Sequence, residues 1–416
     1  MSLDLLKMIA AVFGAALAAA SLPGSIELLL LTVGGLLRAP RRRPRHTISV
    51  SYKKEHSSAL QGEVAGVRLV VVIPAHNEET VIQRCLQSLL ACDKTGADVR
   101  VVVVADNCTD ATAERAAELG ARVLVRHEPD KRGKGYALAF AFDVLQSEGF
   151  DAVLMVDADT VVEPNLLVEF CQLFAAGADA VQCRYGVKNL EASLRTRLMH
   201  IALLAFNVLR PRGRDWWGFS AGLLGNGFGL TRETLQAVPY DARSVVEDLE
   251  YHIRLVRAGR RVRFADATTV RADMPVAGQG VETQRARWEG GRLRMMRDLT
   301  PTLVRAVLSG RFHLLEPLLD LLLLPLAFHV LLLGVILLVP ASIVQLYGLL
   351  GLGIVAFHLA AALYIGGGGV KDLAALAAAP FYIVWKLRMT RLLLRGSNKD
   401  VEWVRTARGH STGDKS

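Results

Sequence analysis

Cysteine is scarce in this 416-residue sequence and a continuous basic tract is missing, and each absence excludes a class of protein. The five cysteines show no paired spacing of the kind that binds zinc, and an odd number makes a poor disulfide framework, so we expect reduced thiols in a core. The net charge is +9, but the basic residues are not interleaved with aromatic residues as in nucleic-acid-binding proteins, so we expect no nucleic acid as a partner. The densest basic run, Arg41 to Arg45, follows an apolar segment, which favours contact with membrane lipids.

The N-terminal segment is long and apolar enough to cross a membrane. Leu5 to Leu37 is almost continuously apolar, with breaks at Pro23-Gly24 and Glu27, and it exceeds the roughly 20 residues that one crossing needs. We predict one kinked or tilted span within an anchor of residues 1–45 that has a basic end. A tight two-helix hairpin is an alternative. A cleaved signal peptide is another, although it would not need the apolar residues that follow Ser21.

Two apolar segments near the C-terminus predict a transmembrane hairpin over residues 317–365. Pro317 to Val339 and Ile343 to Ile365 are each long enough to cross, and Pro340 predicts the turn between them. Three polar side chains lie at or within these spans, and we expect packing contacts or interfacial placement for them rather than function; they are Asp320, His329 and His358.

The segments on either side of this hairpin are expected to lie in the membrane interface. Residues 299–316 precede it. Within residues 370–416, the stretch Asp372 to Leu394 combines lysine and arginine with aromatic residues, which is typical of a helix lying flat on a membrane. An even number of crossings leaves the central domain and the basic tail on one side, and positive charge assigns that side to the cytoplasm. We therefore predict an integral protein of a bacterial inner (plasma) membrane with a cytoplasmic central domain.

Residues 66–298 are expected to form an α/β domain. Arg68 to Pro74 is an unbroken apolar run, typical of a strand buried on both faces, and three similar runs follow with helical stretches between them. This alternation predicts a parallel sheet with crossover helices, on which ligands bind beyond the carboxyl ends of the strands. The other predicted strands are Val99 to Ala105, Ala121 to Val125 and Ala152 to Val156, and the predicted helices are Glu78 to Leu90, Asp110 to Leu119 and Gly135 to Ser147.

Polar residues follow three of these strands. Residues 74–78 end the first strand, Asp106 follows the second, and Asp157 and Asp159 follow the fourth. Two acids directly after a buried strand bring negative charge that a cation would offset. Because Mg²⁺ and Mn²⁺ prefer carboxylate oxygens and commonly bridge protein acids to substrate phosphates, we predict a site for Mg²⁺ or Mn²⁺ at these two aspartates. The alternative to metal binding is that an acid only ends a strand or caps a helix. This alternative is the better explanation for Asp110.

Two glycine-rich segments match neither the P-loop nor the dinucleotide fingerprint. Gly133-Lys134-Gly135 precedes a helix and would lay a backbone and one ammonium against a phosphate. The glycines from Gly222 to Gly229 neither follow the first strand nor lead a βαβ unit. They would let the backbone approach a bound sugar closely, with tight packing an equal alternative for Gly229.

Several short motifs follow one another along the chain: Pro74-Ala75-His76-Asn77-Glu78, Asp106, Gly133-Lys134-Gly135-Tyr136-Ala137-Leu138, Asp157-Ala158-Asp159, Val246-Glu247-Asp248 and Gln284-Arg285-Ala286-Arg287-Trp288. In this order they resemble the inverting family 2 glycosyltransferases of GT-A fold, in particular the membrane-embedded branch with cellulose, hyaluronan and poly-N-acetylglucosamine synthases. The resemblance spans about Arg68 to Arg297. The implied fold class is α/β, a Rossmann-like nucleotide-diphospho-sugar transferase domain flanked by transmembrane and interfacial helices.

The resemblance implies a role for each motif. Asp248 would be the catalytic base that removes the acceptor hydroxyl's proton as this hydroxyl attacks the anomeric carbon, with Glu247 a second catalytic candidate. Both acids begin a predicted helix, where negative charge is favourable without any catalysis. The metal held by Asp157 and Asp159 would lie on the diphosphate. The donor nucleotide would be bound by Pro74, Ala75, Glu78, Asp106, Lys134 and Asp157.

Five residues are candidates for contact with the diphosphate or the acceptor: Gly225, Asn226, Gln284, Arg287 and Trp288. A guanidinium binds two phosphate oxygens at once, and an indole offers an apolar face to a sugar. Without the resemblance, the segment from Gln284 to Arg297 would pass as a basic interfacial helix. The neighbouring tryptophans at 216 and 217 would line the acceptor path or anchor to lipid.

Together these observations predict transfer of a hexose or N-acetylhexosamine from a UDP-sugar to a lipid-linked saccharide acceptor, in exopolysaccharide or glycolipid assembly. About three spans are fewer than a processive synthase uses to enclose a polymer channel, which favours a single addition. The alternative is a processive synthase acting on a growing glycan, with a homo-oligomer or a polysaccharide-assembly partner supplying the channel. A silent scaffold or a transporter is less well supported, because acids occupy every expected position and the sheet is of nucleotide-binding type.

Overall fold

A computed structural model describes residues 3–38, 66–94, 96–241, 244, 246–276 and 279–388, without the side chains of residues 3, 4, 6, 7, 279–287 and 385–388. The predicted basic run at residues 41–45 and the tail after residue 388 lie outside the described residues. The chain divides into two compact units. The sheet unit comprises Ala39–Leu190 and Ser220–Met274, and the helical unit comprises Met1–Arg38, Glu191–Phe219 and Pro275–Ser416.

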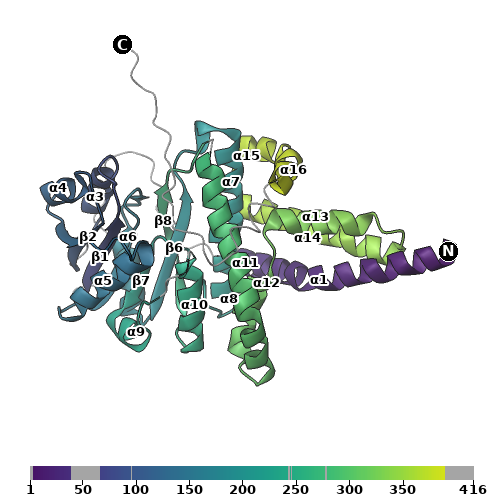
Figure 1. The fold of residues 1–416 in the computed structure, drawn as a ribbon, viewed down its shortest axis with the longest axis horizontal. Coiled ribbons are helices and arrows are strands. Elements are labelled where there is room, and N and C mark those ends of the chain that lie inside the picture. Colours follow the sequence, from purple (N-terminus) through teal and green to yellow (C-terminus); the bar gives the residue numbers. More distant parts are fainter. Residues whose placement is uncertain are drawn as a thin grey trace, which may run out of the picture. The chain divides into compact units, whose positions relative to one another are not determined.

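The sheet unit contains one eight-stranded mixed sheet with the order β3-β2-β1-β4-β7-β6-β8-β5 (Figure 1). Strands β3, β2, β1 and β4 are parallel, as predicted, and β7 runs antiparallel to β4. The strands are β1 (Arg68–Ala75), β2 (Asp98–Asp106), β3 (Arg122–Arg126), β4 (Ala152–Met155), β5 (Val161–Val162), β6 (Ala180–Val187), β7 (Phe228–Thr231) and β8 (Val262–Ala272).

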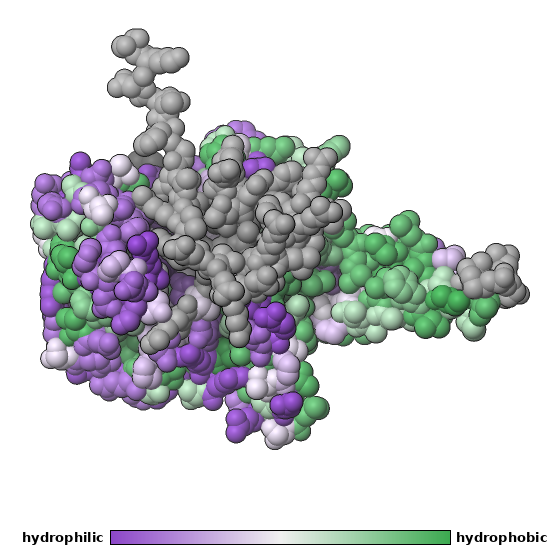
Figure 2. Space-filling model, in the orientation of Figure 1, coloured by the Kyte–Doolittle hydropathy of each residue, from purple (hydrophilic) through white to green (hydrophobic). Residues whose placement is uncertain are grey.

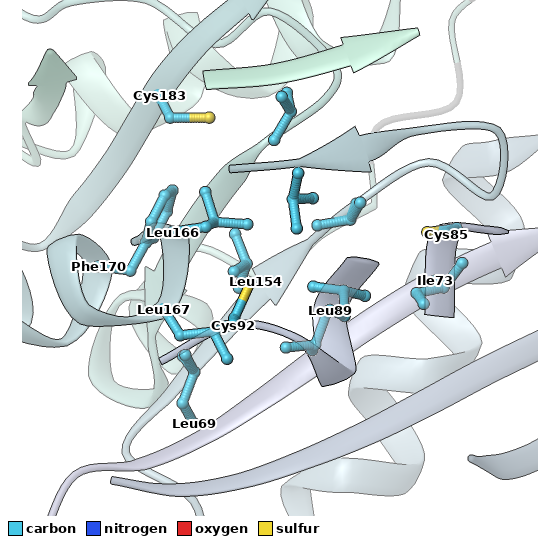
Figure 3. Packing of buried hydrophobic residues seen from close by; sticks show 14 of the residues in the cluster. Leu69, Ile73, Cys85, Leu89, Cys92, Leu154, Leu166, Leu167, Phe170 and Cys183 are labelled. Carbon is cyan, nitrogen blue, oxygen red and sulfur yellow. The ribbon is translucent and has the colours of Figure 1, made fainter. Parts of the chain in front are cut away.

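Helices cover both faces of this sheet, because successive residues of the central strands point to opposite sides. Leu69, Val71 and Ile73 of β1 pack in one cluster with α3 (Ile82–Leu90), α4 (Thr112–Glu118) and α6 (Leu166–Ala175). Figure 3 shows this packing around Leu154 and Phe170, with Cys85, Cys92 and Cys183 among the apolar side chains. Val70 and Val72 pack on the opposite face with α5 (Lys134–Gln146), α9 (Arg232–Ala237) and α10 (Glu247–Arg257). The sheet is therefore the middle of three layers, with two hydrophobic cores.

The cysteines behave as the sequence predicts. All five are free thiols, and four of them are buried. The predicted strands and helices of residues 68–156 are confirmed within a few residues at each end.

Three apolar helices of the helical unit lie side by side: α1 (Leu3–Leu37), α13 (Leu326–Leu337) and α14 (Ser342–Gly366) (Figure 1). Their outward surface is predominantly hydrophobic (Figure 2), and Leu338 and Ile343 are more than 80% exposed. Met8–Leu37 and Ser342–Gly366 are long and apolar enough to cross a membrane. The N-terminal segment forms one helix that contains Pro23, not a two-helix hairpin.

The predicted span from Pro317 to Val339 is broken in the structure. Phe312–Leu322 and Leu326–Leu337 meet at a bend of 77°. Pro325 caps the second helix and has no N–H to continue the first, which explains the break. The region is thus the short helix α12 (Leu315–Leu322) followed by α13, rather than one continuous helix.

Polar side chains inside the apolar bundle bond to one another across helices. Ser25 Oγ lies 3.2 Å from His329 Nε2, and Thr32 Oγ1 lies 2.7 Å from His358 Nδ1. Both histidines are about 1% exposed. These hydrogen bonds join α1 to α13 and α14, which agrees with the expected packing role and is a common way to hold apolar helices together.

A segment from the middle of the sequence also packs against α1. It contains α7 (Leu194–Leu204), the π-helix η2 (Ala205–Leu209) and α8 (Arg210–Trp216). A Cβ atom on Gly213 would lie 2.8 Å from Leu31 Cα, so the two helices approach as closely as backbone allows. Trp217 Nε1 donates to Leu30 O at 2.9 Å, whereas the sequence had predicted the acceptor path or lipid for this side chain.

The remaining helices do not follow the predicted segment boundaries. The helix α11 (Gln279–Leu308) runs through residue 298, where the sequence predicts the end of the α/β domain, and groups with the helical unit. Residues 370–388 form two helices, α15 (Val370–Leu376) and α16 (Ala379–Arg388), rather than one. Short 3₁₀ turns complete the chain at Leu190–Ala192 and Phe312–Leu314.

Candidate active site

The carboxyl ends of β1, β2 and β4 meet at one edge of the sheet unit, as expected for parallel neighbours. Asn77 and Asn107, just after β1 and β2, have φ angles of 55° and 51°. Asparagine tolerates this left-handed conformation better than most residues, and such strained positions are common at functional sites. Each amide oxygen accepts a backbone hydrogen bond, from Thr109 N at 2.7 Å and from Glu128 N at 2.8 Å, which fixes the loops after the strands.

Four of the six residues predicted to bind the donor nucleotide lie on β1 and β2 and on the loop after β1, whereas Lys134 begins α5 and Asp157 follows β4. Pro74 and Ala75 pair in register with residues 104 and 105 of β2. Glu78 is 9% exposed, and its N–H donates to Thr112 Oγ1 at 2.7 Å. These contacts bring the predicted set together with Asp106, the last residue of β2.

Asp106 is buried and paired with a residue that the sequence analysis missed. Arg126, the last residue of β3, donates from Nη1 to Asp106 Oδ1 at 2.5 Å. Burial raises the pKa of the Asp106 carboxyl, and the charge and hydrogen bond of Arg126 offset this only in part. The signal was available, because β3 also ends at this sheet edge.

Lys134 connects the nucleotide side of the site to the metal motif. Its Nζ donates to Asp157 Oδ1 at 2.5 Å and also to the backbone oxygen of Gly225. Burial alone would lower the pKa of the Lys134 ammonium, but the carboxylates of Asp157, Glu247 and Asp248 raise it overall. The lysine therefore stays charged and faces three acids.

A buried amide network fixes the loop before β7 against the metal motif. Asn226 Oδ1 accepts from Asp157 N at 3.1 Å, and Asn226 Nδ2 donates to Thr160 Oγ1 at 2.8 Å. Gln182 donates to Asn226 O at 2.8 Å and accepts from Leu224 N at 2.9 Å. Asn226 was predicted to contact the diphosphate or acceptor, yet it is 1% exposed and its side chain positions the backbone of Asp157.

Gly225, in this loop, and Gly229, in β7, are explained by different contacts. Gly225 has φ +76°, and a Cβ there would lie 3.0 Å from Asp248 Oδ2. Gly225 therefore lets the loop approach the candidate base. At Gly229 a Cβ would lie 2.8 Å from Val153 O, so that glycine is explained by packing within the sheet.

Glu247 and Asp248 form the first turn of α10, as predicted. Burial and the neighbouring Asp248 raise the pKa of Glu247 to about 7, while Lys134 acts in the opposite direction. The pKa of Asp248 is raised by burial, and its Oδ1 accepts from Leu249 N at 2.8 Å. A raised pKa makes a carboxylate a better proton acceptor, which suits both acids to proton transfer.

Tyr240 lies behind these acids and was not singled out in the sequence. Its ring is 5% exposed and packs 4.5 Å from the ring of Tyr251, one helical turn after Glu247. The pKa of the hydroxyl is raised well above its ordinary value by burial and then by the charges of Glu247 and Asp248. Among the described residues, no hydrogen-bond partner reaches this hydroxyl.

The site suits a divalent cation. Lys134 faces the carboxylates of Asp157, Glu247 and Asp248, and one ammonium does not neutralise three of them. Within the described part of the chain, no group of three or more His, Cys, Asp or Glu side chains is arranged to hold a metal by itself. A site of one or two carboxylates completed by substrate phosphates is the usual arrangement for Mg²⁺, and metal binding by Asp157 with Asp159 stays a prediction.

The predicted Gln284, Arg287 and Trp288 all lie on α11, in the helical unit. The side chains of Gln284 and Arg287 are outside the described set, and Trp288 is half-buried. Their contact with a diphosphate or an acceptor therefore stays a prediction.

Comparisons with known proteins identify the family of the chain. A family model described as "Glycosyltransferase like family 2" matches residues 67–291. A probable glycosyltransferase of Bacillus subtilis is 28% identical over 232 residues, covering 54% of this chain and 55% of the relative. The beta-monoglucosyldiacylglycerol synthase of Synechocystis is 30% identical over 260 residues, covering 58% and 52%. The chain thus spans about half the length of these curated relatives.

A solved structure is similar over almost the whole chain. The mannosyltransferase of Pyrobaculum calidifontis, in complex with GDP-Man and Mn²⁺, gives a TM-score of 0.50 at 18% identity and covers 94% of this chain and 96% of that one. At this identity the likeness establishes the fold. The predicted fold class, an α/β domain of GT-A type flanked by apolar helices, is confirmed.

Proposed function

The chain belongs to the glycosyltransferase-like family 2, and from this premise we propose that it transfers a hexose or N-acetylhexosamine from a UDP-sugar to a lipid-linked saccharide acceptor. The observation that carries the proposal is the position of Lys134. Its ammonium bonds to Asp157 of the metal motif and to Gly225, the residue that adjoins Asp248. The groups that the reaction needs, a phosphate-side cation, a metal ligand and a base, are thereby gathered at one place.

In the proposed reaction Asp248 is the general base. It accepts the proton of the acceptor hydroxyl while that oxygen forms a bond to the anomeric carbon, and the bond from this carbon to the diphosphate oxygen breaks with inversion. Glu247, next to it, adds negative charge that favours the positive character of the sugar. Gly225 lets the loop approach Asp248 without a side chain between them. A divalent cation on Asp157 and Asp159 would stabilise the negative charge of the departing diphosphate.

The nucleotide of the donor is assigned to the ends of β1 and β2. Asp106 and Glu78 would accept hydrogen bonds from the base and ribose, and Pro74 and Ala75 provide the backbone beside them. Lys134 would contact the phosphate side. The solved mannosyltransferase binds GDP-Man and Mn²⁺, which supports a nucleotide sugar and a divalent metal; uridine is the part carried over from the family resemblance.

A membrane-borne acceptor is supported by the helical unit and by one relative. Two helices are long and apolar enough to cross a membrane, and the bent pair would make a third span. The Synechocystis relative is a glycolipid synthase by name. We assign the protein to a bacterial inner membrane with the sheet unit in the cytoplasm, and the product to glycolipid or exopolysaccharide assembly. On α11, Gln284 and Arg287 would bind the diphosphate and Trp288 the acceptor sugar.

A processive polysaccharide synthase is the second candidate, favoured by the Gln284-Arg285-Ala286-Arg287-Trp288 motif. It would need an oligomer or a partner protein to enclose a channel, because the described chain offers at most three spans. Product length separates the two: a single addition leaves a lipid one sugar larger, whereas a processive enzyme gives a polymer ladder.

The experiment that tests the proposal uses detergent-purified full-length protein, a lipid extract and a panel of radiolabelled UDP-sugars with Mg²⁺ or Mn²⁺. We expect label in lipid for one sugar, no label with a chelator, and recovery when metal is restored. Asp248→Asn should abolish transfer and keep UDP binding. Glu250→Gln on the same helix is the matched control, because Glu250 bonds to Arg254 at 2.7 Å rather than to the site. Normal transfer by Asp248→Asn would refute the assignment of the base.

A further inference from the structure

Arg126 occupies an unusual position at the rim of the sheet unit. It is the last residue of β3, it is 5% exposed, and its Nη1 donates to Asp106 Oδ1 at 2.5 Å. Asp106 is also 5% exposed. Two opposite charges are thus buried together at the sheet edge where the donor nucleotide is proposed to bind.

The same guanidinium holds the loop after β3 and the beginning of α5. Its Nη1 donates to Lys131 O at 2.9 Å, and its Nη2 lies 3.4 Å from Glu128 Oε2. The guanidinium carbon lies 5.8 Å from the centre of the Tyr136 ring, within the range of a cation–π contact. Tyr136 is two residues after Lys134, so Arg126 connects three elements of the site.

The carboxylate of Asp106 uses its two oxygens differently. The hydrogen bonds that reach it from described residues, from Arg126 Nη1 and from Asn107 Nδ2 at 3.0 Å, both end on Oδ1. Its backbone oxygen lies 2.7 Å from His76 Nδ1, which fixes the main chain. Oδ2 is thus the oxygen left to accept a hydrogen bond from a ligand.

We propose that Arg126 is a positioning residue of the nucleotide subsite, which anchors Asp106 through Oδ1 so that Oδ2 accepts an N–H of the donor's nucleobase. The inference rests on the proposed function, and it adds a residue on β3 to the binding machinery and gives Asp106 one specific partner atom.

Stability alone explains this pair poorly. Burying two charges costs desolvation energy that their attraction often does not repay, and an apolar pair of similar size is frequently as stable or more so. Asp106 shows this cost, because burial raises its pKa despite Arg126. The titratable groups that act on this carboxyl are Arg126, His76 and Glu128, and Arg126 favours the ionised form that can accept a hydrogen bond. A ligand that needs an ionised acceptor accounts for the arrangement.

The test measures UDP binding by calorimetry on full-length protein, for the wild type, Arg126→Gln, Arg126→Lys, Asp106→Asn and the double variant. We expect Arg126→Gln to weaken UDP binding about 10- to 100-fold, because a hydrogen bond to a charged group is lost. The loss of affinity should be larger at pH 6 than at pH 8. The value of kcat at saturating donor should change little. Arg126→Lys should recover part of the affinity. The double variant should bind UDP no more weakly than Asp106→Asn, because both substitutions remove the same interaction.

Arg122→Gln is the matched control. Arg122 lies at the amino end of the same strand and is also paired with an acid, Glu148, at 2.5 Å, but it is far along β3 from the site. It should leave UDP affinity unchanged. If Arg126→Gln lowers the thermal midpoint but binds UDP like the wild type, the pair is structural and the inference is overturned. A wild-type protein that binds neither UDP nor GDP would overturn the proposed function and the inference with it.

Discussion

Glu247 offers the sharpest test of the electrostatics in the candidate site. Its pKa rises from 4.5 to about 7 in the folded protein, chiefly because of burial and then because of Asp248. Between those two values the folded state binds more protons than the unfolded state, so the free energy of unfolding falls as the pH rises through this window. Above pH 7 the buried Glu247 carboxylate is charged, and it lowers the free energy of unfolding by its full amount. Near pH 4.5 Glu247 is protonated in the folded protein, and it lowers this free energy by almost nothing.

The size of the penalty follows from the shift. A difference of one pKa unit between the folded and unfolded states corresponds to about 1.4 kcal/mol, so the destabilisation by Glu247 is at most roughly 3 kcal/mol. Partial exposure of Glu247 to water reduces it, and we expect about 1 to 2 kcal/mol at pH 8. Glu247→Gln removes the charge at nearly constant size. For a domain of this size the thermal midpoint at pH 8 should rise by about 2 to 6 °C.

The assay is a thermal unfolding series in detergent from pH 5 to pH 8. We expect the midpoints of Glu247→Gln and the wild type to coincide near pH 5 and to separate as the pH rises. Glu250→Gln is the control, because it removes a carboxylate that bonds to Arg254 at 2.7 Å and to Ser244 N at 3.2 Å. The thermal midpoint of Glu250→Gln at pH 8 should not exceed that of the wild type. Parallel curves for Glu247→Gln and the wild type, or a variant less stable at pH 8, would refute the reasoning.

Three further substitutions test other features. Tyr240→Phe should raise the thermal midpoint by a few degrees, because a buried hydroxyl without a partner among the described residues costs about 1 to 3 kcal/mol; an unchanged or lower midpoint would contradict this. Gly225→Ala should lower kcat at least about tenfold by displacing Asp248. Gly120→Ala is the control, because Gly120 has a similar φ of +77° and open space around it, and this variant should be less stable without a change in kcat. Gly213→Ala should destabilise the helical unit by about 1 to 3 kcal/mol in a denaturant titration, because the new Cβ would lie 2.8 Å from Leu31 Cα in the backbone of α1. An unchanged stability would show that the two helices can move apart.

The strands that the sequence predicted are continuous apolar runs that alternate with helices along the chain. β1 and β4 are buried on both faces over nearly their whole length, which explains such runs. β8 was not predicted, and it carries Asp266 in its middle. In the fold Asp266 is 3% exposed and bonds to Arg184 of β6 at 2.6 Å. A buried charge of this kind becomes explicable only when its partner, 82 residues away, is known.

The candidate site shows the same limit. The acids could be found because each directly follows a strand or begins a helix, which are positions that local sequence reveals. Arg126 was overlooked although it ends a strand in the same way, but Gln182 could not be found from local sequence. Gln182 lies within β6 and is fully buried, and its function of holding the loop at Asn226 depends on the pairing of β6 with β7. Residues that position a site through their contacts leave no mark in the spacing of a single sequence.

Glu27 carries this argument into the helical unit. In the sequence it is a break in an apolar segment, and an isolated charge there would be costly. In the structure it is 4% exposed and lies 3.3 Å from the guanidinium groups of both Arg210 and Arg214 of α8, which also contact Asp320 of α12. Removing one member of such a buried group leaves the others without compensation, at a cost of about 3 to 5 kcal/mol. Helix α1 is therefore a structural part of the helical unit, bound through Glu27 to a segment some 180 residues later in the chain, rather than a tether that could be exchanged for another apolar helix.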